Sequence, residues 1–257
     1  MLLNGKSRGE GSPLVLIHGL FGDLDNLGGL AKSLAQHFCV YQIDLPNHGQ
    51  SYHTTSMDYQ SQSDAVIAWM NAQHLETVTL VGHSMGGKVA MAIAQRFPER
   101  VSQLVVMDIA PVDYQVSRHD NVFNALRETQ TVTLENRQQA QSIMNRSIEN
   151  PGVTQFLLKS LYKTDHGHYD WRFNIDNLYH GYRDIMGWTA FGPYSGPTLF
   201  VKGQNSEYIQ SEHRDTIVAQ FPHSKAHMVA GTGHWLHAEK PAMVASVIER
   251  FLMPGER

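Results

Sequence analysis

A serine lies between two glycines in the segment VGHSMGG, residues 81–87. This G-x-S-x-G spacing is typical of a nucleophile elbow, a sharp turn that exposes a serine hydroxyl, here that of Ser84, to a substrate cleft. Gly82 and Gly86 carry no side chains that would collide across such a turn. With 21 glycines in 257 residues, the same spacing also arises by chance in ordinary turns. The interpretation therefore depends on the elements on either side of the serine.

Backbone N–H groups near Ser84 are candidates for stabilising an oxyanion. If a helix begins directly after the serine, the N–H of Met85 points to the place where the negative charge would form. A second donor is expected from HGLFG, residues 18–22, a glycine-containing loop after an earlier apolar run. We predict that this donor is the N–H of Leu20, with that of Phe21 as the second choice.

The elements around Ser84 are a predicted buried strand and a predicted helix, which is the setting that an elbow requires. Short apolar runs predict strands at 12–19, 39–45, 77–82, 101–110, 196–203 and 225–231. Helical spacing predicts helices at 26–38, 57–75, 85–97, 211–221 and 240–252. We expect the helix at 57–75 to present Ala65, Ala68, Trp69 and Ala72 on one face.

This alternation of strands and helices predicts an α/β fold with a mostly parallel sheet and right-handed crossovers. It stops between residues 111 and 195, where we find helical patterns and predict no strand. That segment holds 12 of the 24 aromatic residues of the chain. We therefore predict a core formed by residues 1–110 and 196–257, with 111–195 as a helical insertion between two strands.

Several motifs together resemble those of the α/β-hydrolase superfamily. HGLFG, DLPNHGQS, GHSMGG and GTGHWLHAEKP stand in that family's order and spacing, and DIAPVDY makes the set similar to the YbfF type of bacterial acyl esterase. The resemblance implies the α/β-hydrolase fold, with the insertion as a helical lid, and a serine esterase activity. Within DLPNHGQS we expect structural roles only, because Asp44 ends a strand and Gly49 makes a turn.

The resemblance also implies a histidine base near the C-terminus, since the superfamily order is nucleophile, acid, histidine. His234 follows the last predicted strand, where a loop can return its imidazole to Ser84. His237 is a weaker alternative, and His83 is expected to be structural because side chains that are neighbours at such a corner diverge.

The position of the acid departs from the commonest family pattern. The usual site follows the penultimate strand, but Ser206 occupies it, and a serine carries no negative charge. The alternative site is the end of the strand after the elbow helix, where Asp108 stands and where the YbfF type also carries its acid. We predict Asp108, with Glu207 as the alternative.

Aromatic residues of the insertion are candidates for an apolar acyl pocket. We predict that Tyr182 and Trp188 bind substrate, together with Phe21 and Trp235 of the core. Further candidates in the insertion are Trp171, Phe173, Tyr179 and Phe191. The alternative for each is a place in the insertion's own core.

The expected reaction is hydrolysis of a carboxylic ester or an acyl thioester through an acyl-enzyme. Only the family resemblance suggests acyl-CoA as a substrate. A lactonase or a C–C bond hydrolase would use the same triad, and a non-catalytic ligand-binding module is the alternative from another class.

Composition limits the partners of this protein. A net charge of −4 without a basic cluster argues against nucleic acid. No apolar run approaches the ~20 residues that a membrane span needs, and the N-terminus does not match a signal peptide. Cys39 is the single cysteine, which fits a reducing, cytoplasmic location. The 15 histidines match no zinc pattern, so we predict no metal and no other cofactor. Nothing in the residues predicts an oligomeric state.

Overall fold

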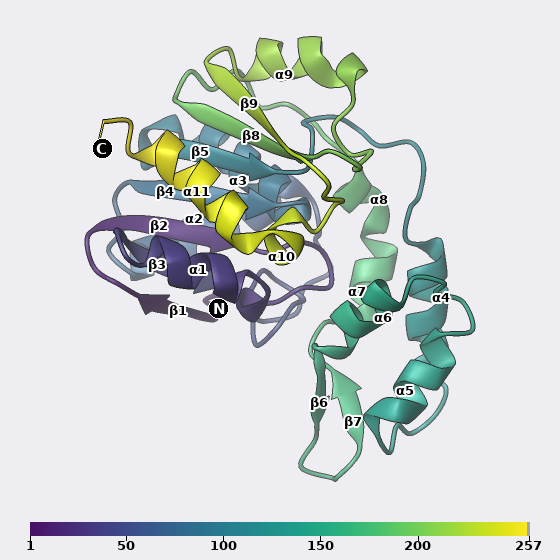
Figure 1. Cartoon of the computed structure of the whole chain (residues 1–257). Coiled ribbons are helices and arrows are strands. Elements are labelled where there is room, and N and C mark those ends of the chain that lie inside the picture. Colours follow the sequence, from purple (N-terminus) through teal and green to yellow (C-terminus); the bar gives the residue numbers. More distant parts are fainter. Residues whose placement is uncertain (256–257) are drawn as a thin grey trace.

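A seven-stranded sheet forms the centre of the protein in the computed structural model, which describes residues 1–255 (Figure 1). Its strand order is β1-β3-β2-β4-β5-β8-β9, and all neighbours run parallel except β1 and β3. The strands are β1 (Gly5–Arg8), β2 (Ser12–Ile17), β3 (Phe38–Ile43), β4 (Val78–His83), β5 (Val101–Met107), β8 (Thr198–Gly203) and β9 (Ser224–Val229). The predicted mostly parallel sheet is confirmed.

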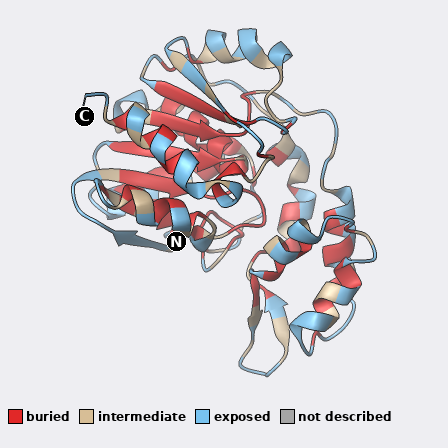
Figure 2. Ribbon diagram, in the orientation of Figure 1, coloured by how far each residue is buried: buried red, intermediate tan, exposed pale blue. Residues whose placement is uncertain are grey.

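Helices cover both faces of this sheet, so its central strands are buried on both sides (Figure 2). In β2, the side chains of Val15 and Ile17 enter one apolar core and those of Leu14 and Leu16 enter the other. The face of Leu14 is covered by α1 (Gly28–Leu34), α10 (Leu236–Glu239) and α11 (Pro241–Leu252). The opposite face is covered by α2 (Tyr59–Ala72), α3 (Met85–Arg96) and α9 (Arg214–Gln220). Two-sided burial explains why these strands are continuous apolar runs.

The predicted helix at 57–75 is confirmed as α2, but the face that carries Ala65, Ala68, Trp69 and Ala72 is only partly buried. Trp69 is buried and Ala68 and Ala72 are exposed, while Val66 and Met70 are buried. The physical reason is side-chain size, because burying a valine or a methionine removes more apolar surface from water than burying an alanine.

The insertion contains five helices and a short hairpin to one side of the sheet (Figure 1). Its elements are α4 (Asp120–Thr129), α5 (Arg137–Met144), α6 (Pro151–Leu158), β6 (Leu161–Lys163), β7 (Tyr169–Trp171), α7 (Ile175–His180) and α8 (Tyr182–Met186). Within residues 1–255, three short 3₁₀ helices complete the set of elements: η1 (Leu24–Leu27), η2 (Pro98–Arg100) and η3 (Ser211–His213).

The prediction of no strand between residues 111 and 195 is wrong, because β6 and β7 pair antiparallel across it. Each strand has only three residues, too few for an alternating pattern to stand out. The sheet strand β1 was also not predicted, since all four of its residues are exposed and its sequence, GKSR, has no apolar side chain.

The end of the insertion is anchored to the core. The Tyr194 hydroxyl donates a hydrogen bond to the Val101 carbonyl at 2.9 Å, and the Trp188 indole N–H donates to the Gln220 side chain at 2.9 Å. The predicted core extends to residue 257, whose last two residues lie outside the described part of the chain.

Candidate active site

Ser84 occupies the sharp corner between β4 and α3 in a strained backbone conformation. Its φ is 54° and its ψ is −122°, a combination that costs a non-glycine residue free energy. A Cβ on Gly82 would come within 2.2 Å of the Gly86 carbonyl oxygen, and one on Gly86 within 2.4 Å of the Ile17 oxygen. Glycine is therefore required at both positions, because other parts of the backbone lie too close to leave room for a Cβ atom.

Three side chains from distant parts of the chain form a line of hydrogen bonds at this corner. His234 Nε2 lies 3.0 Å from Ser84 Oγ, and His234 Nδ1 lies 2.7 Å from Asp108 Oδ2. His234 stands in the loop between β9 and α10, and Asp108 follows β5 directly with a φ of 54°. The structure thus brings together the three residues that were predicted as nucleophile, base and acid.

The Asp108 carboxylate is fully buried and has further donors beside His234. The Gly203 backbone N–H donates to Oδ1 at 2.9 Å, and the Ser206 hydroxyl donates to Oδ2. These two donors, together with His234, hold the carboxylate in a fixed orientation. Ser206, at the usual site of the acid, therefore contacts the relocated acid, a role that sequence reasoning missed.

Glu207 points away from this line. Its side chain is 70% exposed and forms an ion pair with Arg118 at 2.8 Å. The neighbouring Tyr208 ring instead stacks on the His234 imidazole, with ring centroids 4.0 Å apart. This stacking adds an apolar contact that restricts the rotation of the imidazole.

His83 and His237 pack against each other behind His234, with ring centroids 4.3 Å apart. His83 Nε2 lies 2.9 Å from the His234 carbonyl oxygen, so it donates there. Burial holds the pKa of His83 well below its usual value, and burial beside His234 lowers the pKa of His237 to about 3. Both rings are therefore neutral at pH 7, and their observed contacts are structural.

The two predicted oxyanion donors are free of protein acceptors. Across residues 1–255, neither the Leu20 nor the Met85 backbone N–H donates a hydrogen bond to the protein. The Phe21 N–H is engaged, since it donates to His48 Nε2 at 3.2 Å. Burial lowers the pKa of His48 to about 3, which keeps this nitrogen available as an acceptor. The geometry thus favours Leu20 over Phe21, and His48 is a supporting residue that the sequence did not reveal.

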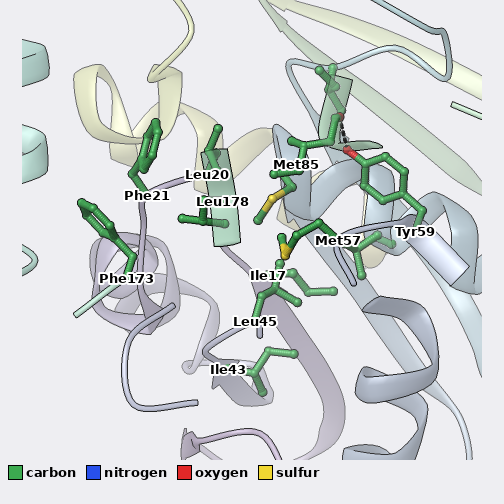
Figure 3. Packing of buried hydrophobic residues seen from close by; sticks show 14 of the residues in the cluster. Ile17, Leu20, Phe21, Ile43, Leu45, Met57, Tyr59, Met85, Phe173 and Leu178 are labelled. Carbon is green, nitrogen blue, oxygen red and sulfur yellow. Dashed lines mark hydrogen bonds between the residues drawn. The ribbon is translucent and has the colours of Figure 1, made fainter. Parts of the chain in front are cut away.

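A cleft of about 580 Å³ opens in front of Ser84, with walls from both the core and the insertion. Phe21 and Trp235, both predicted to bind substrate, line this cleft. The Phe21 ring packs beside Phe173, with centroids 5.3 Å apart, while Leu20 lies nearer to Met85 (Figure 3). Phe173 is thus a buried support of the wall.

Tyr182 lines a second, smaller chamber that also reaches Ser84. Trp188, also predicted to bind substrate, lines neither of the two cavities that reach Ser84. Its indole packs against Tyr59 at 5.7 Å and lines a separate surface depression, because its N–H is held by Gln220 on the core. Phe191 lines that depression as well.

Residues 1–255 contain no group of three His, Cys, Asp or Glu side chains arranged to hold a metal ion. In the same residues, no helix has the length and apolar character needed to cross a membrane.

Comparison with known proteins places this geometry in a family. The family model for the alpha/beta hydrolase fold matches residues 12–241. The chain is 44% identical to Esterase YbfF of Escherichia coli over 241 residues, which covers 94% of this chain and 93% of the relative. It is 35% identical to the sn-1-specific diacylglycerol lipase ABHD11 of Danio rerio, covering 96% of this chain and 80% of that one.

A solved structure also matches nearly the whole chain. The structure described as a marine microorganism esterase superposes with a TM-score of 0.93 at 34% sequence identity. The match covers 97% of this chain and 99% of the other.

Proposed function

The chain belongs to the α/β-hydrolase family, and on this premise we propose that it is a carboxylic ester hydrolase with Ser84 as nucleophile, His234 as base and Asp108 as acid. The observation that carries the proposal is the line of hydrogen bonds from Ser84 through His234 to Asp108 at the edge of a cleft. The relatives named as an esterase and a lipase support the same class of reaction.

In the first half of the proposed reaction, Ser84 Oγ attacks the ester carbonyl carbon while His234 Nε2 takes the hydroxyl proton. The backbone N–H groups of Leu20 and Met85 stabilise the oxyanion. Asp108 remains charged, orients the imidazole and stabilises the imidazolium. His234 then gives the proton to the leaving oxygen, whose bond to the carbonyl carbon breaks, and an acyl-enzyme results.

In the second half, water attacks the acyl-enzyme by the same route in reverse. His234 takes a proton from the water and returns it to Ser84 Oγ, which releases the carboxylic acid. No residue other than the three proposed is needed to move a proton.

We also propose that residues 111–195 act as a lid over the core formed by 1–110 and 196–257. The support is that residues of α4 and α6 and the segment between α5 and α6 line the cleft opposite Ser84. Acyl thioesters, acyl-CoA included, are a further candidate substrate class carried by the family resemblance. A cytoplasmic location stays a prediction.

The test is covalent labelling with a fluorophosphonate probe, together with hydrolysis of p-nitrophenyl butanoate. We expect rapid labelling of the wild type and its loss in Ser84→Ala. Ser147→Ala is the matched control, because Ser147 is a second serine in the cleft wall and is expected to leave labelling intact. Ligand binding without labelling or turnover in the wild type would instead support a non-catalytic binding module.

A further inference from the structure

Two cavities of very different size meet at Ser84. The cleft has a volume of about 580 Å³ and the smaller chamber about 40 Å³. Five residues line both cavities, namely Leu20, Ser84, Arg118, His119 and Tyr208. Among the described residues, His234 and Trp235 line only the cleft, and Met85 lines only the chamber. The site therefore has a histidine side and an oxyanion side.

The chemistry of acyl transfer assigns one part of an ester to each side. Ser84 Oγ bonds to the carbonyl carbon, and the carbonyl oxygen turns toward the N–H groups of Leu20 and Met85. The leaving oxygen must receive its proton from His234 Nε2, so the leaving group lies on the side of His234. That side is the large cleft, and the acyl chain is left with the chamber beside Met85.

We propose that the chamber is the acyl site and that the enzyme prefers esters of short, apolar acids with bulky leaving groups. This inference rests on the proposed function. The chamber, at about 40 Å³, is more than tenfold smaller than the cleft at about 580 Å³, so it suits a short acyl group such as butanoyl and not a long one.

Most polar groups of the chamber wall bond to other parts of the protein, which leaves the chamber a mainly apolar surface. Lys88 is 1% exposed, and its ammonium donates to the carbonyl oxygens of Val112, Met186 and Gly187 at 2.8–2.9 Å. The Tyr59 hydroxyl donates to the Ile185 carbonyl at 2.6 Å.

The same hydrogen bonds fix the size of the chamber. Val112 and Gly187 lie near the two ends of the insertion, and Lys88 is one turn along α3 from Ser84. Lys88 therefore clamps both ends of the insertion to the elbow helix. The remaining wall combines apolar side chains, Leu20, Met85, Ile109, Val116, Ile185 and Met186, with the polar side chains of Tyr114, Arg118, His119, Tyr182 and Tyr208.

The first experiment measures kcat/KM of the wild type on p-nitrophenyl esters from acetyl to octanoyl. We expect a fall of at least ~10-fold from butanoyl to octanoyl, because added methylenes cannot enter the chamber. In a parallel series of butanoate esters with methyl, benzyl and naphthyl leaving groups, we expect kcat/KM not to fall as the leaving group becomes larger. Equal rates on butanoyl and octanoyl esters would overturn the inference.

A matched pair of variants then locates the acyl chain. Ile185 lines the chamber and Ile148 lines the cleft, and both are buried isoleucines of the insertion, 7% and 4% exposed. We expect Ile185→Ala to raise the octanoyl-to-butanoyl ratio at least ~10-fold, and Ile148→Ala to keep this ratio within about twofold of wild type. Ile185→Val, a milder change, is expected to shift the ratio in the same direction.

A ratio that responds to Ile148→Ala and not to the Ile185 variants would place the acyl chain in the cleft and overturn the inference. That result leaves the proposed function intact, because the esters are still hydrolysed. Hydrolysis that persists in Ser84→Ala would instead overturn the proposed function itself.

Discussion

Replacing Asp108 with asparagine tests the proposed acid through the geometry of its two oxygens. Oδ1 accepts the Gly203 backbone N–H, which cannot move aside, so the asparagine oxygen must stay there. The NH₂ group then takes the place of Oδ2 and faces Ser206 and His234. The serine hydroxyl can rotate to accept a hydrogen bond.

The imidazole has only one way to meet this NH₂ group, which is to present an unprotonated Nδ1. Its proton is then on Nε2, the nitrogen that faces Ser84 Oγ, so His234 can no longer take the serine proton. A triad held in this wrong tautomer loses about 10⁴ in kcat in the known case of such a substitution. We expect a loss of ~10³–10⁴ in kcat here, or about 4–5 kcal/mol of transition-state stabilisation.

The assay is steady-state hydrolysis of p-nitrophenyl butanoate, with urea unfolding to verify that the variant is folded. Glu207→Gln is the matched control, since it makes the same chemical change in an exposed carboxylate at the alternative acid position. We expect the control to retain wild-type kcat. A loss of kcat in Glu207→Gln with little change in Asp108→Asn would refute this assignment of the acid.

Three further predictions follow from buried polar groups. Ser206→Ala removes one donor to the Asp108 carboxylate. We expect kcat/KM to fall about 10-fold with the chain still folded, because a hydrogen bond to a charged group is lost. An unchanged kcat/KM would show that Gly203 alone holds the carboxylate. Lys88→Met leaves three buried carbonyl oxygens without their donor, so we expect urea unfolding to show a loss of about 3 kcal/mol or more and limited proteolysis to cut near the ends of the insertion. His48 is buried, and its pKa is lowered to about 3 in the folded protein. Below pH 6.5, His48 therefore binds a proton in the unfolded chain but stays neutral in the folded protein. The stability that this neutral histidine contributes above pH 6.5 is lost as the pH falls toward 3, by about 2 kcal/mol at pH 5. Urea unfolding of the wild type and of His48→Gln at pH 8 and pH 5 measures this loss as the difference between the two proteins, because His83 and His237 contribute to the pH dependence of both. An equal loss in the two proteins would contradict the assignment.

Much of the fold was predictable because its determinants are local. Central strands such as β2 are apolar on both faces, and helices such as α3 repeat apolar residues at helical spacing. The strands β1, β6 and β7 escaped prediction because each is short or fully exposed, so only pairing with its partner strand defines it.

Some residues of the candidate site were likewise predictable from the sequence, and others are defined only by tertiary contacts. The G-x-S-x-G spacing and its flanking elements made Ser84 a candidate, and the family order of motifs pointed to His234 and Asp108. The roles of Ser206 and His48 depend on contacts with residues 98 and 27 positions away, which no local pattern carries. The place of Trp188 outside both cavities was not predictable for the same reason, since its contact with Gln220 decides where the indole lies.

By itself, the sequence determined the class of the fold, the corner at Ser84 and the types of residue available for the chemistry. These follow from side-chain size, polarity and backbone conformation, which act over a few neighbouring residues. Only the tertiary structure decided which carboxylate reaches His234, which N–H groups remain free and how the space around Ser84 is divided. Such outcomes depend on distances between segments far apart in the chain, and close packing sets those distances only when all the elements are assembled.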